Sequence, residues 1–288
     1  MTYLLLVNPT SGGGKGREFG ERTETFLKKN QIAYRDISGS SYESARSQLN
    51  SELSTSVKGI IAVGGDGIVH LVIQVIAHTK LPLILIPAGT GNDFARTLNL
   101  PLNDPEFILQ RILTSQPIFV DLARVNGKYF AQILSTGFDS VVNERANRMR
   151  KIKGTLKYNL SILAELPIFK PIEYHFSIDG AQFTARAMLI AIANGPSYGG
   201  GMRVCPQAEI TDGQLDIMIL HPVTKFEFLR IFPRVFSGTH VNHPAVSIQR
   251  GRTVRVSAAA VAYADGERIG PLPISAEIEP RALSTWVF

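Results

Sequence analysis

The sequence predicts two domains, an α/β domain built on a parallel sheet and then a mainly antiparallel β domain. Up to about residue 122, short and almost uninterrupted apolar runs alternate with segments of helix length. This alternation is typical of a parallel sheet that helices cover on both faces. Beyond about residue 125, β-rich runs with polar breaks predominate. A length of 288 residues also fits two domains of ordinary size.

The first domain, residues 1–122, has five predicted strands, at 4–7, 33–37, 59–63, 83–86 and 118–122. Helix-compatible segments separate them, at 16–30, 42–53, 69–78 and 104–115. Asn103 before Asp104-Pro105-Glu106 is a start signal for the last of these helices.

The second domain, residues 123–279, has predicted strands at 173–178, 187–193, 215–220, 253–257 and 274–278. Asp179-Gly180 is a hairpin-turn signal after the first of them. Helices are expected at 139–150, 155–166 and 224–236. The last residues, 280–288, could form a strand that returns to the first domain.

The composition predicts a globular protein with an anionic partner. A formal charge of +6 and a pI near 9.5 favour nucleic acid, nucleotide phosphates or an acidic lipid surface. Nucleic acid is not expected, because the chain has no RNA-recognition aromatic motif, zinc-ligand spacing or helix-turn-helix signal. We interpret the densest basic stretch as a solvated helix face. It consists of Arg145, Arg148, Arg150, Lys151, Lys153 and Lys157.

Neither a signal peptide nor a membrane span is predicted. The first apolar run lacks a basic flank, and no run reaches the roughly 18 apolar residues of a spanning helix. The single cysteine, Cys205, excludes an intrachain disulfide and is interpreted as a small buried hydrophobic residue. We therefore expect a cytoplasmic protein whose membrane association is peripheral.

A glycine-rich bend follows the predicted strand at 59–63, with the sequence Gly64-Gly65-Asp66-Gly67. Open α/β sheets bind ligands at the carboxyl ends of their parallel strands. Glycine lets backbone N–H groups approach a ligand closely, and the N-terminus of the next helix adds further N–H groups and partial positive charge. The bend therefore predicts a phosphate site, where the Asp66 carboxylate would hold Mg²⁺ against the phosphate oxygens.

Two further bends strengthen this prediction. Gly89-Thr90-Gly91-Asn92-Asp93 follows the strand at 83–86, with Asn92 or Asp93 as the expected helix cap. The stretch 8–16 follows the first strand and is also rich in glycine. It lacks the spacing of a Walker A loop, and the dinucleotide pattern G-x-G-x-x-G is absent from the chain. Three such bends on one sheet edge predict a phosphate-binding edge.

The chain resembles the diacylglycerol kinase catalytic-domain family of lipid kinases, which includes soluble bacterial diacylglycerol kinases and sphingosine kinases. The resemblance extends over essentially the whole chain. It rests on residues 8–12, 64–67 and 89–96, and then on 194–195 with 199–202, 211–216 and 265–267. It implies a first domain like those of NAD kinase and phosphofructokinase and a second domain that is a β-sandwich.

The resemblance implies that ATP lies along the glycine bends and that the acceptor hydroxyl enters the cleft between the domains. The implied nucleotide contacts are Asn8, Thr10, Gly12, Ser38, Gly64, Gly65, Asp66, Gly67, Ile68, Val69, His70, Leu71 and Thr90. Asp66 and Asp93 resemble members of a network of aspartate, water and magnesium. Asp265 or Glu267 resembles the general base that takes the proton of the acceptor hydroxyl.

A second, structural cation site is implied around Asp212, which would supply a side-chain oxygen. Glu209 and Gln214 would contribute main-chain carbonyls. Such oxygen ligands suit Mg²⁺ or Ca²⁺.

The chain departs from the family directly after the first glycine core. Threonine, any residue, asparagine and glutamate are usual there, and this chain has Ile68, Val69, His70 and Leu71. A hydroxyl, an amide and an acid are lost, which puts ATP affinity and activity in question while leaving the backbone of the bend unchanged. His70 is interpreted as a helix-start histidine without a ligand role, the alternative being a phosphate contact in its protonated form.

Diacylglycerol at an anionic membrane surface is the first choice of acceptor, with other lipid alcohols as alternatives. An apolar surface for its acyl chains is predicted beside the basic stretch. The residues are Leu160, Ile162, Leu163, Leu166, Ile168 and Phe169. A catalytically weak or inactive nucleotide- or lipid-binding homologue is the second hypothesis, and an NAD kinase is the third. The sequence does not determine the oligomeric state, and a dimer stays open.

Overall fold

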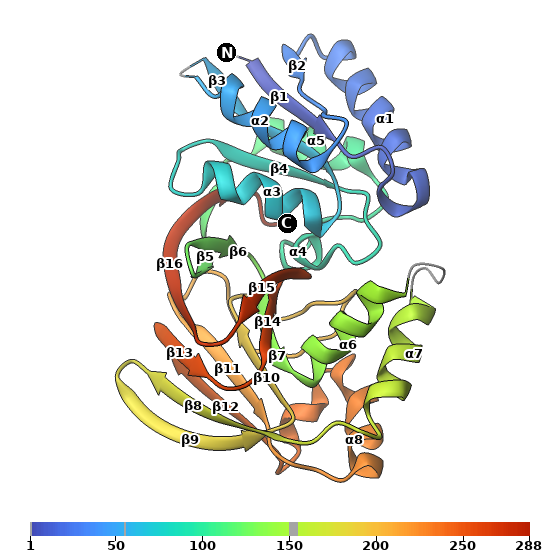
Figure 1. Cartoon of the computed structure of the whole chain (residues 1–288). Coiled ribbons are helices and arrows are strands. Elements are labelled where there is room, and N and C mark those ends of the chain that lie inside the picture. The colour runs from blue at the N-terminus through green and yellow to red at the C-terminus, as the bar shows by residue number, and fades with distance from the viewer. Residues whose placement is uncertain (1, 55, 150–154) are drawn as a thin grey trace.

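The structure is a computed structural model that describes residues 2–54, 56–149 and 155–288, with side chains described from residue 160 onward in the last range (Figure 1). Two domains lie one above the other, and both chain termini are in the first. None of the described helices is long and apolar enough to span a bilayer.

Four parallel strands form the sheet of the N-terminal domain, in the order β2-β1-β3-β4. Strands β1, β3 and β4 are nearly all apolar because helices cover both faces, whereas the edge strand β2 is polar and mostly exposed. Helix α1 packs on α5, and α2 packs on α3. The elements are β1 (Thr2–Val7), η1 (Ser11–Gly14), α1 (Lys15–Lys29), β2 (Tyr34–Asp36), α2 (Tyr42–Glu52), β3 (Val57–Gly64), α3 (Asp66–Ile76), β4 (Pro82–Pro87), α4 (Asp93–Thr97) and α5 (Pro105–Thr114).

The C-terminal domain is a β-sandwich, as expected. Strand β5 crosses the predicted boundary at residue 122. The elements are β5 (Ile118–Val125), β6 (Lys128–Phe130), β7 (Ile133–Gly137), α6 (Phe138–Arg148), α7 (Thr155–Glu165), β8 (Ile172–Ile178), β9 (Ala181–Ala187), β10 (Leu189–Ala193), β11 (Leu215–Leu220), α8 (Lys225–Ile231), η2 (Phe232–Val235), η3 (Thr239–Asn242), β12 (Val246–Gly251), β13 (Thr253–Ser257), β14 (Val261–Ala264), β15 (Glu267–Pro271) and β16 (Ile274–Thr285).

The sandwich buries the two faces of its second sheet differently. This sheet has the antiparallel order β12-β11-β10-β7-β14-β15. Along β10, Ile190 and Ile192 pack into the core between the two sheets, whereas Ala191 and Ala193 pack toward α6, α7 and α8. Alternate side chains of a strand point to opposite faces, so each face has its own apolar core.

Strand β16 joins the domains into one continuous sheet. Its first half pairs with β13 and β5 in the sandwich, and its end pairs in parallel with β4 through Ser284 and Thr285. The C-terminal segment therefore returns to the N-terminal sheet. This pairing fixes the position of the sandwich relative to the glycine bends.

Several element boundaries differ from the sequence-based expectation. Helix α3 begins at Asp66, so this carboxylate lies in the first helical turn rather than in the loop before it. Asp104, not Asn103, caps α5 by accepting a hydrogen bond from the N–H of Phe107. The predicted helix at 224–236 continues beyond α8 as the 3₁₀ helix η2, where Pro233 lacks the N–H that an α-helix needs. Periodicity did not detect the short strands β6, β7, β12, β14 and β15.

Candidate active site

The predicted nucleotide contacts gather at one edge of the N-terminal sheet, because β2, β1, β3 and β4 are neighbours and run in the same direction. Asn8, Thr10 and Gly12 follow β1. Ser38 follows β2, the segment from Gly64 to Leu71 covers the end of β3 and the start of α3, and the exposed Thr90 follows β4. The topology therefore places these residues along a single edge.

Two glycine bends touch each other through their backbones. A Cβ added to Gly89 would lie 2.4 Å from the Cα of Gly65, and one added to Gly65 would lie 2.9 Å from the Cα of Gly89. Gly12 has a positive φ of 55°, and a Cβ there would lie 2.2 Å from the carbonyl oxygen of Ala88. Part of the glycine pattern therefore serves packing between the bends.

We expect Gly89→Ala to lower the free energy of unfolding by about 1–3 kcal/mol, because the added methyl overlaps the backbone of Gly65. Gly67→Ala is the matched control, since no atom lies within 4 Å of its added Cβ. Alanine should instead stabilise this helical position by about 0.5–1 kcal/mol. Urea unfolding of both variants measures the difference, and equal stabilities would contradict close packing of the bends.

Side-chain hydrogen bonds stabilise the bends after β1, β2 and β4. Asn8 Oδ1 accepts hydrogen bonds from the N–H of Thr10, at 3.2 Å, and from its hydroxyl, at 3.0 Å. Ser38 Oγ accepts from the N–H of Val7, at 2.9 Å. Asn92 accepts from the N–H of Gly89 and donates to its carbonyl, both at 2.8 Å, instead of capping α4. These polar side chains shape the loops.

The residues that depart from the family pattern face the core. Ile68, Val69 and Leu71 belong to the apolar core of the N-terminal domain. The N–H groups of Ile68 and Val69 both donate to the carbonyl of Gly65. His70 is only 5% exposed, and burial lowers its pKa, so the neutral form is favoured over a protonated phosphate contact.

Asp66 and Asp93 form a pair of neighbouring carboxylates at the starts of α3 and α4. A Cβ on Gly91 would lie 2.9 Å from Asp66 Oδ2 and 3.2 Å from Asp93 Oδ2. Asp66 Oδ1 accepts a hydrogen bond from the N–H of Phe94, at 3.2 Å. Burial and then the charge of Asp93 raise the pKa of Asp66 to about 6. A cation between the two carboxylates would relieve this repulsion.

A glycine loop of the C-terminal domain contacts Asp93 of this pair. The N–H groups of Gly200 and Gly201 donate to the two oxygens of Asp93, at 2.8 and 2.7 Å. Arg96 donates to the carbonyl of Gly91, at 3.2 Å. The sequence indicated residues 199–202 only as part of the family pattern, and their contact with Asp93 is a feature of the tertiary structure.

Asp265 holds together the backbone where β6 leads into β7. Its oxygens accept hydrogen bonds from the N–H groups of Ala131, Gln132 and Ile133, at 2.6, 3.0 and 3.2 Å. Burial raises the pKa of Asp265 to about 7, although these three donors lower it. Both oxygens are therefore engaged with the protein's own backbone.

The surroundings of Glu267 differ from those of Asp265. Glu267 is exposed at the start of β15, two residues further along the turn. Burial lowers the pKa of His70 in α3 and raises the pKa of Tyr42 in α2; the negative charge of Glu267 opposes the first shift and adds to the second. Glu267 is therefore within electrostatic range of both helices of the N-terminal domain.

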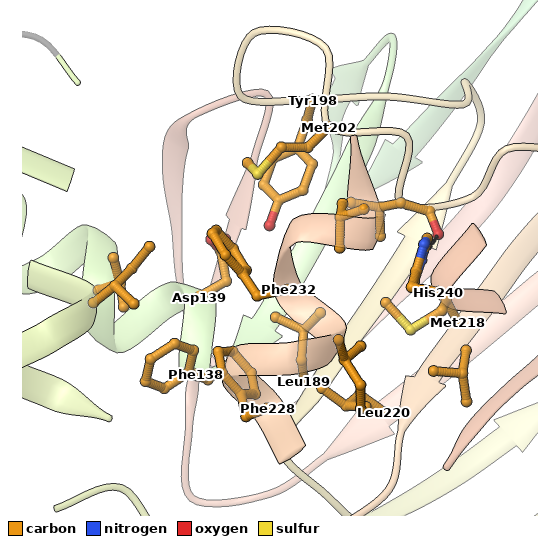
Figure 2. Close-up of a pocket in the computed structure, with 16 residues that line it drawn as sticks. Phe138, Asp139, Leu189, Tyr198, Met202, Met218, Leu220, Phe228, Phe232 and His240 are labelled. Carbon is orange, nitrogen blue, oxygen red and sulfur yellow. Dashed lines mark hydrogen bonds between the residues drawn. The ribbon is translucent and has the colours of Figure 1, made fainter. Parts of the chain in front are cut away.

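An apolar pocket lies between the second sheet of the sandwich and the helices α6, α7, α8 and η2. It contains about 650 Å³ of space including its mouth. Figure 2 shows Tyr198 and Met202 at one end, Phe228 and Leu220 at the other, and Asp139 in the wall between them. Tyr198 and Met202 flank the glycine loop that contacts Asp93. One end of the pocket is therefore connected to Asp93 through the loop 199–201.

The residues of the predicted acyl-chain surface do not form a single surface, because some are buried and others are exposed. Ile162, Leu166 and Phe169 are buried, and Ile162 lines the pocket. Leu163 and Ile168 are exposed. In the basic stretch, Arg145 forms an ion pair with Glu165, and residues 150–153 lie outside the described residues. Cys205 is buried, as expected.

The predicted structural cation site holds an ion pair. Asp212 Oδ1 accepts from the N–H of Gln214, at 2.9 Å, and Oδ2 accepts from the guanidinium of Arg250. Arg250 also lies 3.5 Å from the buried Asp216. Glu209 lies on the surface. Among the described residues, no three His, Cys, Asp or Glu side chains form a metal-binding group.

The melting temperature in the presence of EDTA distinguishes the ion pair from the predicted cation. If Arg250 supplies the positive charge, excess EDTA should leave the melting temperature of an Asp66→Asn variant, which lacks the carboxylate pair, unchanged. Arg250→Ala should then cost about 1–3 kcal/mol, and added Mg²⁺ should restore part of that stability. Arg255→Ala, at an exposed position of β13, is the control. Equal destabilisation of the wild type and the Asp66→Asn variant by EDTA would instead support the cation at Asp212.

The fold and the site define a two-domain class of protein, with a glycine-rich edge and two adjacent carboxylates in the first domain and an apolar pocket in the second. Comparison with known families agrees with this description. Residues 2–125 match the diacylglycerol kinase catalytic domain, and residues 132–287 match the YegS C-terminal NAD kinase beta sandwich-like domain.

The chain belongs to the diacylglycerol kinase family. It is 37% identical over 285 residues to a diacylglycerol kinase of Mycobacterium tuberculosis strain H37Rv, covering 96% of this chain and 92% of that protein. It is 29% identical over 278 residues to a diacylglycerol kinase of Bacillus subtilis, covering 93% and 90%. A crystal structure of a diacylglycerol kinase from Bacillus anthracis has the same fold, with a TM-score of 0.75 at 20% identity and coverage of 100% and 97%.

Proposed function

We propose that this protein is an ATP-dependent lipid kinase that phosphorylates diacylglycerol to phosphatidic acid. The observation that carries the proposal is the position of the apolar pocket. One end of it is formed by Tyr198 and Met202, whose loop contacts Asp93 at the phosphate-binding edge. An apolar acceptor and a bound nucleotide would therefore meet at the carboxylate pair.

ATP would lie along the glycine edge, with its phosphates near Gly65, Gly67 and Gly12. Asp66 and Asp93 fit Mg²⁺, because they are adjacent oxygen donors whose mutual repulsion a cation relieves. Bound Mg²⁺ neutralises charge on the transferring phosphoryl group. With Ile68 and Leu71 in the core, the backbone and these carboxylates would provide the binding that the family's polar side chains provide elsewhere.

Glu267 is the proton acceptor in this proposal. The acceptor oxygen bonds to the γ-phosphorus as the bond to the β–γ bridging oxygen breaks, ADP leaves, and Glu267 takes the hydroxyl proton. Asp265 is a positioning residue, because both its oxygens bind the backbone at 131–133. Its three hydrogen bonds fix the turn that carries Glu267.

The pocket would hold an acyl chain of the acceptor. Phe138, Phe228 and Leu220 are among the side chains that line it. Its lining is almost entirely apolar, with the buried Asp139 as a polar group in its wall. Such a lining favours a hydrocarbon chain over the sugar and base of a soluble nucleotide acceptor.

The test is transfer of labelled γ-phosphate from Mg²⁺-ATP to diacylglycerol in mixed micelles. Labelled phosphatidic acid is the expected product, and NAD in place of lipid should give no product. Phosphorylation of NAD alone would overturn the proposal in favour of an NAD kinase. The second candidate is a nucleotide-binding homologue without turnover, which the buried Ile68–Leu71 segment favours. Tight ATP binding without any labelled lipid, over a panel of lipid alcohols, would identify it.

A further inference from the structure

Helix α8 has apolar side chains on two opposite sides, and the fold accounts for only one of them. Phe228 and Ile231 are buried and line the pocket. Phe226 and Leu229 point away from it and are 70% and 47% exposed. A surface helix normally presents polar side chains outward. The outer side therefore requires an explanation other than core packing.

Further exposed apolar side chains lie on segments that contact α8 or follow it. Lys225, at the start of α8, donates to the carbonyl of Phe169, which places the 65% exposed Ile168 beside α8. After η2, the 55% exposed Phe236 contacts Phe232 edge to face. We name Ile168, Phe226, Leu229 and Phe236 the α8 patch. In Figure 1, α8 lies at the end of the C-terminal domain far from the N-terminal domain.

Basic side chains accompany the patch. Residues 225–236 include Lys225, Arg230 and Arg234 and a single acidic residue, Glu227, which lies 3.4 Å from His243. The guanidinium of Arg230 lies 5.5 Å from the ring centre of Phe226. Exposed aromatic residues among positive charges are typical of segments that bind anionic membrane surfaces.

We infer that the α8 patch docks on an anionic lipid bilayer. The functional role of this docking rests on the proposed function. In the docked protein, α8 and η2 would lie between the bilayer and the apolar pocket that is proposed to hold the acyl chain. The two helices present Phe226 and Leu229 to the lipid and Phe228 and Ile231 to the pocket. A second copy of the chain fits the patch less well, because a symmetric contact would bring the same basic side chains together.

The experiment is sedimentation of the full chain with phosphatidylcholine vesicles, with and without phosphatidylglycerol. Binding should require phosphatidylglycerol. The double variant Phe226→Ser with Phe236→Ser should lower the partition coefficient roughly tenfold or more, since each exposed phenylalanine loses its burial in lipid. Arg230→Glu with Arg234→Glu should also lower it, by at least about fivefold for each lost charge.

The matched control is Phe107→Ser with Leu113→Ser, two residues of α5 that are 52% and 46% exposed. It should bind vesicles as the wild type does. Equal binding by the Phe226 and Phe236 variant would overturn the inference. A wild-type dimer in light scattering that this variant converts to a monomer would also overturn it, because the patch would then be an interface between copies.

Turnover on dioctanoylglycerol in solution separates this inference from the proposed function. The Phe226 and Phe236 variant should phosphorylate this short-chain acceptor at the wild-type rate, because neither residue lines the pocket. A wild type that binds anionic vesicles but phosphorylates no lipid would overturn the kinase proposal and still support docking. A wild type that phosphorylates dioctanoylglycerol but never binds vesicles would overturn the docking alone.

Discussion

Replacing Glu267 with glutamine is expected to reduce lipid phosphorylation by about 10²–10⁴-fold, the usual contribution of a positioned general base. Glutamine keeps the size of the side chain but cannot take the hydroxyl proton. Because Glu267 is exposed, the Glu267→Gln variant should have the melting temperature of the wild type. The measurement is kcat for labelled phosphate transfer in mixed micelles.

Two variants make the Glu267 result specific. Glu173→Gln, at an exposed glutamate of β8, should leave kcat unchanged. Asp265→Asn should instead change the melting temperature, because an amide cannot accept hydrogen bonds on both sides as this carboxylate does, and because it removes a charge that burial disfavours. If Asp265→Asn melts as the wild type does while losing all turnover, and Glu267→Gln stays active, the base is Asp265.

Asp66→Asn is expected to lower turnover by about 10²–10³-fold, the usual loss when one electrostatic stabiliser of a transition state is removed. Loss of the carboxylate should also weaken binding of ATP in the presence of Mg²⁺ more than in its absence. Titration of ATP with and without Mg²⁺, followed by isothermal calorimetry, measures this difference. Equal ATP affinity of variant and wild type with Mg²⁺ would contradict a magnesium role for Asp66.

The same substitution should stabilise the protein when Mg²⁺ is absent. The folded-state pKa of Asp66 is about 6, above the unfolded value near 4. The folded state therefore binds more protons between these pH values, and stability falls as the pH rises through this window. Asparagine removes this cost, which is about 3 kcal/mol above pH 6. Asp104→Asn, which keeps a helix cap, is the control and should show no such gain.

The sequence was most informative about the N-terminal sheet. Strands β1, β3 and β4 are buried on both faces, so they appear as continuous apolar runs, and a glycine-rich bend follows each of them. The short strands β6, β7, β14 and β15 were missed because three to five residues give too little periodicity. For the same reason, the turn between β14 and β15 was the weakest part of the site prediction.

The choice between Asp265 and Glu267 shows the limit of a local motif. Two residues apart in the sequence, they have opposite surroundings, one hydrogen-bonded to three backbone N–H groups and the other exposed. The partners of Asp265 lie more than a hundred positions earlier in the chain. The Gly200 loop and Asp93 are similarly distant in the sequence, and Arg250 lies 38 positions after Asp212.

By itself the sequence determined the family, the two fold classes and the edge of the sheet where phosphates are expected. These properties follow from local patterns, because apolar runs, glycine bends and carboxylates are properties of short segments. Tertiary structure alone decided which carboxylates approach each other, where the apolar pocket begins, and which side of α8 stays exposed. These properties depend on strand β16 and on loops that join distant segments, whose packing no local pattern specifies.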